Sequence, residues 1–181
     1  MKQQHIVWDW NGTLFHDIDA VVAATNEVFK PYGIGPYDAE GFRAAYTRPI
    51  WRFYERLLGR SLHEGEWERL DQGFHEHYHR LMPSCELTPG ALDCLTGWTG
   101  TQSLLSMWMH DRLVSKVAEL GIDRHFTRVD GLRRFPGGGP KAEHMVAHLR
   151  ALGVDPETVV VIGDSVDDAH AARYVGARAI L

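Results

Sequence analysis

The sequence predicts an α/β protein, a doubly wound parallel sheet that is interrupted after its first strand by an all-helical insertion. Two short apolar runs that each end in an acidic residue, at 5–9 and 158–164, predict buried strands of a parallel sheet. After residue 87, strand patterns alternate with helical patterns, as they do in βαβ units. Between residues 15 and 86 only helical patterns occur, so the insertion is expected there.

Each element has its own signal in the sequence. The first strand ends at Asp9, because the turn Asn11-Gly12 follows. The residues Ser61 to Glu64 form a capping-box pattern, which predicts the start of a helix that reaches about Leu81. Further helices are predicted at 17–30, 38–46, 49–58, 88–98, 111–120, 141–152 and 167–175, and further strands at 103–107, 126–130, 158–162 and 177–181. A glycine-rich loop at 136–140 precedes the helix 141–152.

These patterns predict two domains. Residues 1–14 and 87–181 form a discontinuous α/β core domain, and residues 15–86 form a helical cap domain. Because the insertion follows the first strand, we expect the cap to lie over the carboxyl ends of the strands, where open α/β sheets bind their ligands. A cap in that place would act as a lid.

The composition narrows the class of partner. With 181 residues, 44% of them hydrophobic, the chain is long enough for one core and a smaller inserted unit. With a net charge of −5, the sequence lacks the excess of basic residues that is typical of nucleic-acid-binding proteins. Only two cysteines are present, and neither an apolar run of membrane-spanning length nor a secretory leader occurs. We therefore expect a cytoplasmic protein that binds a small molecule and neither nucleic acid nor a membrane.

Acidic residues follow the two best strands of the predicted sheet. Asp9 ends the first strand and Asp164 follows the strand 158–162, with Asp167 and Asp168 close behind. Strands that are neighbours in a parallel sheet would bring these carboxylates to one edge, where their repulsion favours a bound cation. Hard oxygen ligands of this kind suit Mg²⁺. The other interpretation is that these residues are helix N-caps or turn formers.

Four motifs, in order along the chain, resemble those of the haloacid dehalogenase superfamily. The segment from Asp9 to Leu14, Asp-Trp-Asn-Gly-Thr-Leu, resembles its first motif. Ser106 resembles the second-motif residue, Lys141 the third, and the segment Gly163-Asp164-Ser165-Val166-Asp167-Asp168 the fourth. The insertion between the first two motifs is similar to the helical cap of phosphoglycolate-phosphatase-like members. The resemblance implies a Rossmann-like core and a Mg²⁺-dependent phosphatase of a small phosphorylated metabolite.

The resemblance also implies roles for single residues. Asp9 would be the nucleophile that forms an aspartyl phosphate, with Ser106 and Lys141 beside the phosphoryl group. The implied metal ligands are Asp9, the backbone carbonyl of Asn11, Asp164 and Asp168, of which Asp168 would support either the metal or Lys141. The expected substrate contacts are Gly12 and Thr13 through their backbone N–H groups, Met107, and Arg48 of the cap, which could clamp an anionic group.

Asn11 departs from the pattern of the family. Most phosphatases of the superfamily carry there a second Asp, which protonates the leaving alkoxide, and an amide cannot act as an acid at neutral pH. The substrate could have a good leaving group, or His16, Asp17 or a cap residue could supply the proton. Alternatively, the protein binds metal and phosphate without turnover, or with weak turnover. A phosphonoacetaldehyde hydrolase is less favoured, because the only lysine of the insertion, Lys30, does not stand where that enzyme needs it.

Overall fold

The computed structural model describes residues 4–133 and 140–181 and divides into two compact units. The α/β unit comprises residues 1–16 and 87–181, and the helical unit comprises residues 17–86. The first boundary therefore falls two residues after the predicted one. Phe15 remains with the α/β unit because its ring stacks on that of Trp10, with ring centroids 4.9 Å apart and planes inclined by 8°.

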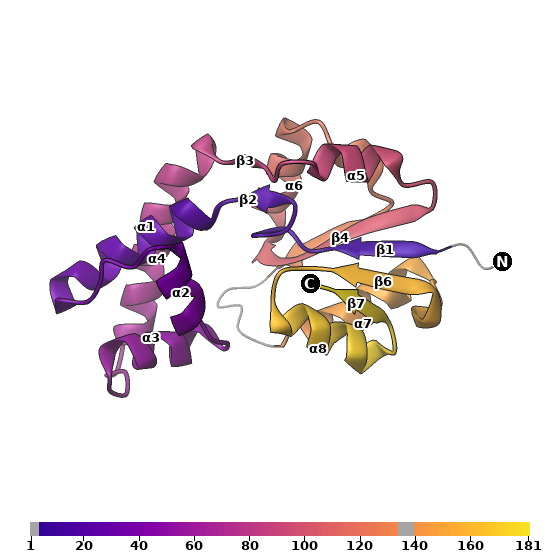
Figure 1. Ribbon diagram of the computed structural model, residues 1–181. Coiled ribbons are helices and arrows are strands. Elements are labelled where there is room, and N and C mark those ends of the chain that lie inside the picture. The colour runs from indigo at the N-terminus through magenta and orange to yellow at the C-terminus, as the bar shows by residue number, and fades with distance from the viewer. Residues whose placement is uncertain (1–3, 134–139) are drawn as a thin grey trace. The chain divides into compact units, whose positions relative to one another are not determined.

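The α/β unit is built on a five-stranded parallel sheet with the order β5-β4-β1-β6-β7 (Figure 1). All four residues of the central strand β1 are buried, as predicted for a strand that is covered on both faces. The strands are β1 (His5–Trp8), β4 (Thr101–Met109), β5 (Val129–Leu132), β6 (Val159–Ile162) and β7 (Arg178–Ile180).

Helices cover both faces of this sheet. In Figure 1, α5 and α6 lie on one face and α7 and α8 on the other, so the predicted doubly wound α/β architecture is confirmed. These helices are α5 (Ala91–Gly97), α6 (His110–Glu119), α7 (Lys141–Leu152) and α8 (Val166–Val175). Short 3-10 turns lie at Asp123–His125 and Pro156–Thr158. Apart from Pro140, the predicted glycine-rich loop lies outside the described residues.

Two strands differ from their predicted bounds. β4 runs for nine residues instead of five, because its polar residues Thr101 and Gln102 are paired with β1. The strand predicted at 126–130 begins at Val129, because the 3-10 turn before it ends only at His125. Even so, the backbone N–H of Thr127 already donates to the carbonyl of Gln102, over 2.8 Å.

The core between the sheet and helices α7 and α8 consists of small and branched apolar side chains. Valines and leucines of three neighbouring strands meet the inner faces of the two helices there. Its fully buried members are Val7, Leu105, Met145, Leu149, Val159, Val161, Ala171 and Ala172. This packing holds α7 and α8 against the sheet, and the amino-terminal ends of the two helices carry Lys141 and Asp168.

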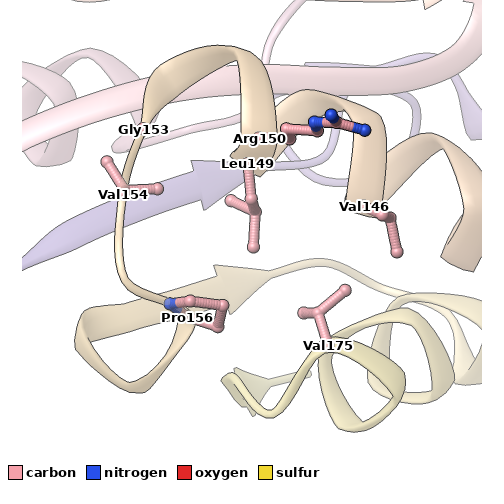
Figure 2. A pocket seen from close by; sticks show the side chains of 7 residues that line it. All are labelled: Val146, Leu149, Arg150, Gly153, Val154, Pro156 and Val175. Atoms are coloured by element: carbon pink, nitrogen blue, oxygen red, sulfur yellow. The ribbon is translucent and has the colours of Figure 1, made fainter.

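An apolar groove of about 350 Å³ lies between α7 and α8 (Figure 2). Its only charged lining residue is Arg150, and the others are Val146, Leu149, Gly153, Val154, Pro156 and Val175. These residues lie toward the carboxyl end of α7, whereas Lys141 is its first residue. The groove is therefore not part of the acidic site described below.

The helical unit has an aromatic core of its own. Phe29, Phe42, Phe53 and Tyr54 pack against one another with tilted or edge-on rings 5.2 to 5.9 Å apart along their chain of contacts. The helices are α1 (Ile18–Phe29), α2 (Ala39–Ala45), α3 (Ile50–Leu58) and α4 (Glu66–Leu81), with 3-10 turns at Lys30–Tyr32 and Met82–Ser84. The short strands β2 (Phe15–His16) and β3 (Glu86–Leu87) pair where the chain enters and leaves this unit.

The predicted capping box at Ser61 to Glu64 is wrong. Helix α4 begins later, at Glu66, after Gly65 with φ of 69°. The reason is the carboxylate of Glu66, which turns back toward the preceding loop. It accepts hydrogen bonds from the N–H of His63 at 2.9 Å and from Nη1 and Nη2 of Arg60 at 2.8 Å each. Among the described residues, no helix has both the length and the apolar composition that a membrane span requires.

Candidate active site

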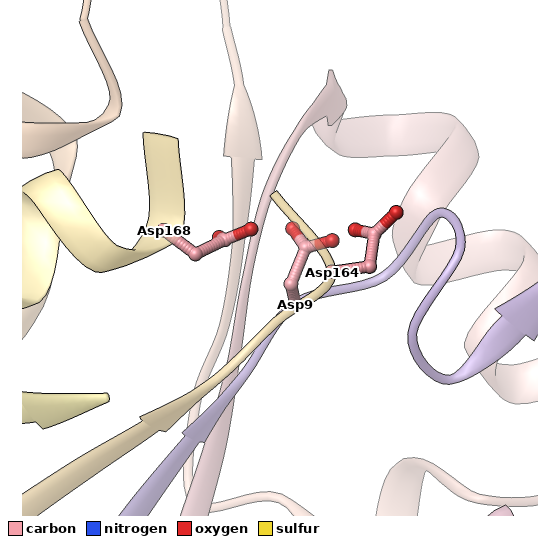
Figure 3. A group of neighbouring side chains, drawn as sticks. All are labelled: Asp9, Asp164 and Asp168. Carbon is pink, nitrogen blue, oxygen red and sulfur yellow. The ribbon is translucent and has the colours of Figure 1, made fainter. Parts of the chain in front are cut away.

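Asp9 stands at the point where β1 ends against β6. Its backbone N–H donates to the carbonyl of Ile162, the last residue of β6, over 2.8 Å. Asp164 follows Ile162 by two residues, so the two strand ends carry Asp9 and Asp164 to the same edge of the sheet (Figure 3). Asp168 reaches this edge from the first turn of α8.

These three carboxylates form one cluster. One oxygen of each of Asp9, Asp164 and Asp168 lies within 4.8 Å of those of the other two. Asp9 and Asp168 are buried, with 8% and 1% of their surface exposed, and Asp164 is exposed. The predicted meeting of strand-end carboxylates is therefore present in the structure, with one of the three open to solvent.

Lys141 is the cation beside the cluster. Its Nζ contacts Oδ1 of Asp9 and, at 2.5 Å, Oδ1 of Asp168. Lys141 is only 3% exposed and is the first residue of α7, where the helix dipole disfavours a positive charge. Burial by itself lowers the pKa of Lys141, but the carboxylates of Asp9 and Asp168 outweigh burial and raise it. The amine is therefore charged.

Asp168 has its other oxygen engaged in a helix cap. Its Oδ2 accepts the backbone N–H and the hydroxyl of Ser165, at 3.1 and 2.6 Å, which makes a capping box at the start of α8. Gly163 leaves the space for this carboxylate, because a Cβ there would stand 2.3 Å from Cγ of Asp168. Asp168 thus links the start of α8 to Lys141. The sequence carries a local signal for this cap, an Asp three residues after a Ser.

Burial and neighbouring acidic groups both act on the Asp9 carboxyl. Burial raises the pKa of the Asp9 carboxyl to about 6, and Lys141 offsets only part of that rise. The carboxylates of Asp168 and Asp164 raise this pKa further. The cluster offers carboxylate oxygens from three residues within 4.8 Å of one another. A small divalent cation with oxygen ligands fits this donor set.

The turn after Asp9 is shaped around Asp164. Gly12 has φ of 77°, and a Cβ on it would lie 2.3 Å from Oδ2 of Asp164. The N–H of Gly12 donates to the carbonyl of Phe15 at 2.9 Å and that of Thr13 to Trp10 at 3.2 Å. Both amides close the turn itself in this conformation, and their expected contact with substrate stays a prediction. Gly12 also provides room for the carboxylate.

Ser106 is buried in β4, on the strand next to β1. Trp8, the residue before Asp9, pairs with Leu104, and this is the last pair between β1 and β4. Asp9 follows Trp8 by one residue, and Ser106 follows Leu104 by two. The Oγ of Ser106 accepts the N–H of Trp108 at 3.0 Å. Because that bond uses an acceptor site of the hydroxyl, its proton remains available for donation.

The other predicted site residues are placed as follows. Asn11 is partly buried and makes an isolated bridge to Phe15, and Met107 is partly buried next to Ser106. The hydroxyl of Thr13 is only 3.5 Å from Oδ1 of Asp164, a weak contact. Arg48 is exposed and belongs to the helical unit, between α2 and α3.

Of the groups considered for replacing the missing acid, namely His16, Asp17 or a cap residue, Asp17 is engaged elsewhere. Its Oδ2 accepts the hydroxyl of Tyr78 at 2.7 Å, and both residues are buried in the helical unit. This bond has no local signal in the sequence, because the two residues stand 61 positions apart. His16 is exposed in β2 of the α/β unit and remains a candidate.

The fold and the order of these residues agree with a known family. The sequence model of the haloacid dehalogenase-like hydrolases matches residues 6–181, nearly the whole chain. The chain belongs to this family. The predicted recognition and the predicted class of enzyme, a phosphatase of the haloacid dehalogenase-like hydrolases, are thereby confirmed.

Three proteins are similar to this hydrolase over nearly all of its chain and 84% to 86% of their own. A phosphoglycolate phosphatase of Chromobacterium violaceum is 29% identical over 99% of this chain and 86% of its own. A crystal structure of a putative phosphoglycolate phosphatase from Lactobacillus plantarum has a TM-score of 0.83 at 18% identity, covering 99% of this chain and 86% of its own. A mutant of CbbY from Rhodobacter sphaeroides, crystallised with xylulose-1,5-bisphosphate, has a TM-score of 0.74 at 21% identity, over 98% and 84%.

Proposed function

We propose that this hydrolase is a Mg²⁺-dependent phosphatase of a small phosphorylated metabolite, with Asp9 as its nucleophile. The observation that carries the proposal is the contact of Asp9 with Lys141 at a strand end, inside a cluster of three carboxylates. A buried carboxylate held by an ammonium group and facing a cation site is placed to accept a phosphoryl group.

The first step transfers the phosphoryl group to the protein. Lys141 holds Oδ1 of Asp9, so Oδ2 is the oxygen proposed to attack. A bond forms between Oδ2 and phosphorus while the bond from phosphorus to the leaving oxygen breaks, and that oxygen departs with the electron pair. Lys141 keeps Oδ1 neutralised, and the Ser106 hydroxyl donates to a phosphoryl oxygen. Water then attacks phosphorus, which releases inorganic phosphate and restores Asp9.

The metal site is proposed at the exposed side of the cluster. Asp9, Asp164 and the backbone carbonyl of Asn11 would hold Mg²⁺, and Asp168, with both oxygens already engaged, would serve Lys141 instead. When bound, the ion would supply positive charge to the substrate phosphoryl oxygens. The carboxylates of Asp9 and Asp164 would hold the ion in place. Gly12, which has no Cβ, leaves the space that the Asp164 carboxylate occupies.

Asn11 shapes the choice of substrate. Because an amide cannot protonate the leaving oxygen, a substrate that leaves as a stable anion suits this site best. An acyl phosphate has such a leaving group. The relatives named phosphoglycolate phosphatase make 2-phosphoglycolate the first alkyl phosphate to test. We assign substrate selection to the helical unit as a cap, with Arg48 as its proposed anion contact.

The deciding experiment measures release of phosphate with Mg²⁺ from acetyl phosphate, p-nitrophenyl phosphate and 2-phosphoglycolate. We expect turnover of the first two at least, and a loss of about 10³-fold or more in Asp9→Asn, since the nucleophile is removed. The matched control is Asp93→Asn, the same change at an exposed position of the α/β unit, which should keep full activity.

Two results would contradict the proposal. The first is activity in Asp9→Asn that equals that of Asp93→Asn, which would place the chemistry elsewhere. The second is an absence of turnover on all three substrates while phosphate and Mg²⁺ still bind. That second result would identify the chain as a binding protein that keeps the fold of the hydrolases without their activity.

A further inference from the structure

A continuous chain of buried and half-buried polar side chains crosses the α/β unit away from the acidic cluster. Thr101 contacts His5 at 2.8 Å, His5 contacts Ser103 at 2.8 Å, Ser103 contacts His148 at 2.8 Å, and His148 contacts Asp130 at 2.7 Å. Ser103, His148 and His5 are 0%, 1% and 2% exposed. The proposed reaction uses none of these groups, so their burial needs another explanation.

All of these strand residues point to one face of the sheet. On β4, Thr101 and Ser103 alternate with buried residues of the other face, and His5 pairs in register with Thr101. Asp130 of β5 pairs with Leu105, which follows Ser103 by two residues and therefore faces the same side. Leu105 belongs to the core beneath α7, so this is the face that α7 covers. The chain thus joins three strands to that helix.

The hydrogen bonds of the chain have one consistent direction. Arg128 and His148 hydrogen-bond to Asp130 and outweigh the effect of its burial, so the pKa of this carboxyl is lowered and it accepts only. Burial lowers the pKa of His148, which is therefore neutral and donates from Nδ1 to Asp130. Its Nε2 must then accept the hydroxyl proton of Ser103, which leaves the Ser103 oxygen to accept from His5.

The chain ends in the same consistent way. Burial lowers the pKa of His5 to about 4, so this ring too is neutral. If His5 donates from Nε2 to Ser103, its Nδ1 accepts the hydroxyl proton of Thr101. One arrangement of protons satisfies every member, and loss of any member leaves a buried neighbour without its bond.

His148 and Lys141 lie on one stripe of α7. They are seven residues apart, which is two turns and about 10 Å along a helix axis. Met145 lies between them on the same buried face. Apolar contacts such as those of Met145 hold a helix against a sheet but do little to fix its position along its own axis, because they are not directional. Hydrogen bonds to Ser103 and Asp130 do fix it.

We propose that His148 is a positioning residue for the phosphatase, setting the axial position of α7 and thereby the place of the Lys141 amine on Asp9. This inference rests on the proposed function of Asp9 and Lys141. A displacement of the amine along the helix axis weakens its contact with Asp9 more in the transition state, where the charge on phosphorus and oxygen is redistributed, than in substrate binding.

The test compares four variants with the wild type, using p-nitrophenyl phosphate and saturating Mg²⁺. His148→Leu removes both hydrogen bonds at similar volume. His148→Gln restores both, since its amide has a donor and an acceptor at nearly the spacing of the two ring nitrogens. His144→Leu makes the same change at a partly exposed histidine of the same helix. Leu95→Ala opens a cavity at a buried residue of α5, on the other face of the sheet, which lowers stability without touching α7.

We expect kcat of His148→Leu to fall about 10- to 100-fold with KM changed less than threefold. His148→Gln should regain kcat to within about fivefold of wild type. His144→Leu and Leu95→Ala should keep wild-type kcat when assayed below their unfolding temperatures. If His148→Leu does not fold, Ser103→Ala replaces it and should lower kcat several-fold, because it removes one of the two bonds.

Hydrogen exchange gives a readout that is independent of activity. Backbone amides at the start of α7 should exchange faster in His148→Leu than in Leu95→Ala, and at the wild-type rate in His148→Gln. Equal exchange of α7 in His148→Leu and wild type, or equal kcat in His148→Leu and Leu95→Ala, would overturn the inference. A wild-type protein without turnover would instead count against the proposed function, and the exchange result would still decide whether His148 positions α7.

Discussion

Gly12 and Asp164 approach so closely that a single added carbon on Gly12 would lie 2.3 Å from a carboxylate oxygen of Asp164. The two residues are 152 positions apart in the sequence, and they meet because β1 and β6 are neighbours in the sheet. The glycine is therefore part of the proposed metal site without offering a ligand.

Gly12→Ala should weaken the binding of Mg²⁺, because the new methyl group displaces Asp164. We expect the Mg²⁺ concentration for half-maximal activity to rise about tenfold, as for other changes that shift a metal ligand indirectly. Gly121→Ala is the matched control, since Gly121 has φ of 68° but no atom within 4 Å of an added Cβ. Both variants should lose about 1 kcal/mol of stability from the positive φ. An equal Mg²⁺ requirement in the two would contradict the explanation.

Asp164→Asn should change the thermal stability in opposite directions with and without Mg²⁺. In the absence of metal the variant should unfold at a higher temperature than the wild type, because it removes one of three mutually repelling carboxylates. With Mg²⁺ in excess the order should reverse, since the wild type gains binding free energy, about 2.7 kcal/mol at 100 times Kd. Thermal unfolding in chelator and in Mg²⁺ measures this, and a wild type insensitive to Mg²⁺ would refute it.

Asn11→Asp should raise turnover selectively for poor leaving groups. The new carboxyl can protonate an alkoxide, a role that contributes about 10²- to 10⁴-fold in enzymes that use it. The p-nitrophenolate ion needs little protonation, so its release should gain much less. The measurement is the ratio of kcat/KM for 2-phosphoglycolate to that for p-nitrophenyl phosphate. An increase of equal size for both would show that Asn11 does not limit proton transfer.

Asp71→Asn should stabilise the protein near neutral pH. Burial in α4 raises the pKa of the Asp71 carboxyl from 3.8 to about 6. A raised acid pKa means that folding favours the protonated form, so this residue's contribution to stability is lost as pH rises from about 4 through 6. At pH 7.5 the variant should gain about 1 kcal/mol, because water still screens part of the charge. Urea unfolding at pH 4.5 and 7.5 tests this, and an equal gain at both values would contradict it.

Glu66→Gln should act in the opposite sense. Hydrogen bonds from Arg60 and from the N–H of His63 lower the pKa of the Glu66 carboxyl from 4.5 to about 2. Its stabilisation is therefore present above pH 4.5 and is lost as the pH falls through about 2. The variant should be less stable than the wild type at pH 7, and the difference should shrink on acidification. A difference that stays constant down to pH 2 would contradict this assignment.

The sequence was sufficient for the sheet, the positions of Asp9, Lys141 and Asp164, and the location of the insertion. Short apolar runs and their terminal carboxylates are local signals, and parallel strands gather such residues at one edge. The sequence was not sufficient to assign the two oxygens of the Asp168 carboxylate, one of which contacts Lys141 while the other caps α8. The pattern from Ser165 to Asp168 is visible in the sequence, but the choice between helix cap, lysine partner and metal ligand depends on distances.

Other features depend on residues from several segments and have no local signal. His5 lies in an apolar run and is typical there of a buried strand residue, and its chemistry emerges only beside Ser103 and His148. The start of α4 was misplaced for a different reason, because the Glu66 carboxylate binds back to Arg60 and His63, six and three residues earlier, in place of the predicted capping pattern.

The pairing of β2 with β3 joins the two ends of the helical insertion to each other. A segment whose ends are neighbours occupies the same attachment point whether it is long, short or of another fold. In evolutionary terms, the continuous segment 17–86 can be replaced as a whole while the order of the sheet strands and the acidic cluster stay unchanged. New substrates are then accessible through replacement of one continuous stretch of gene, with no need to rebuild the chemistry.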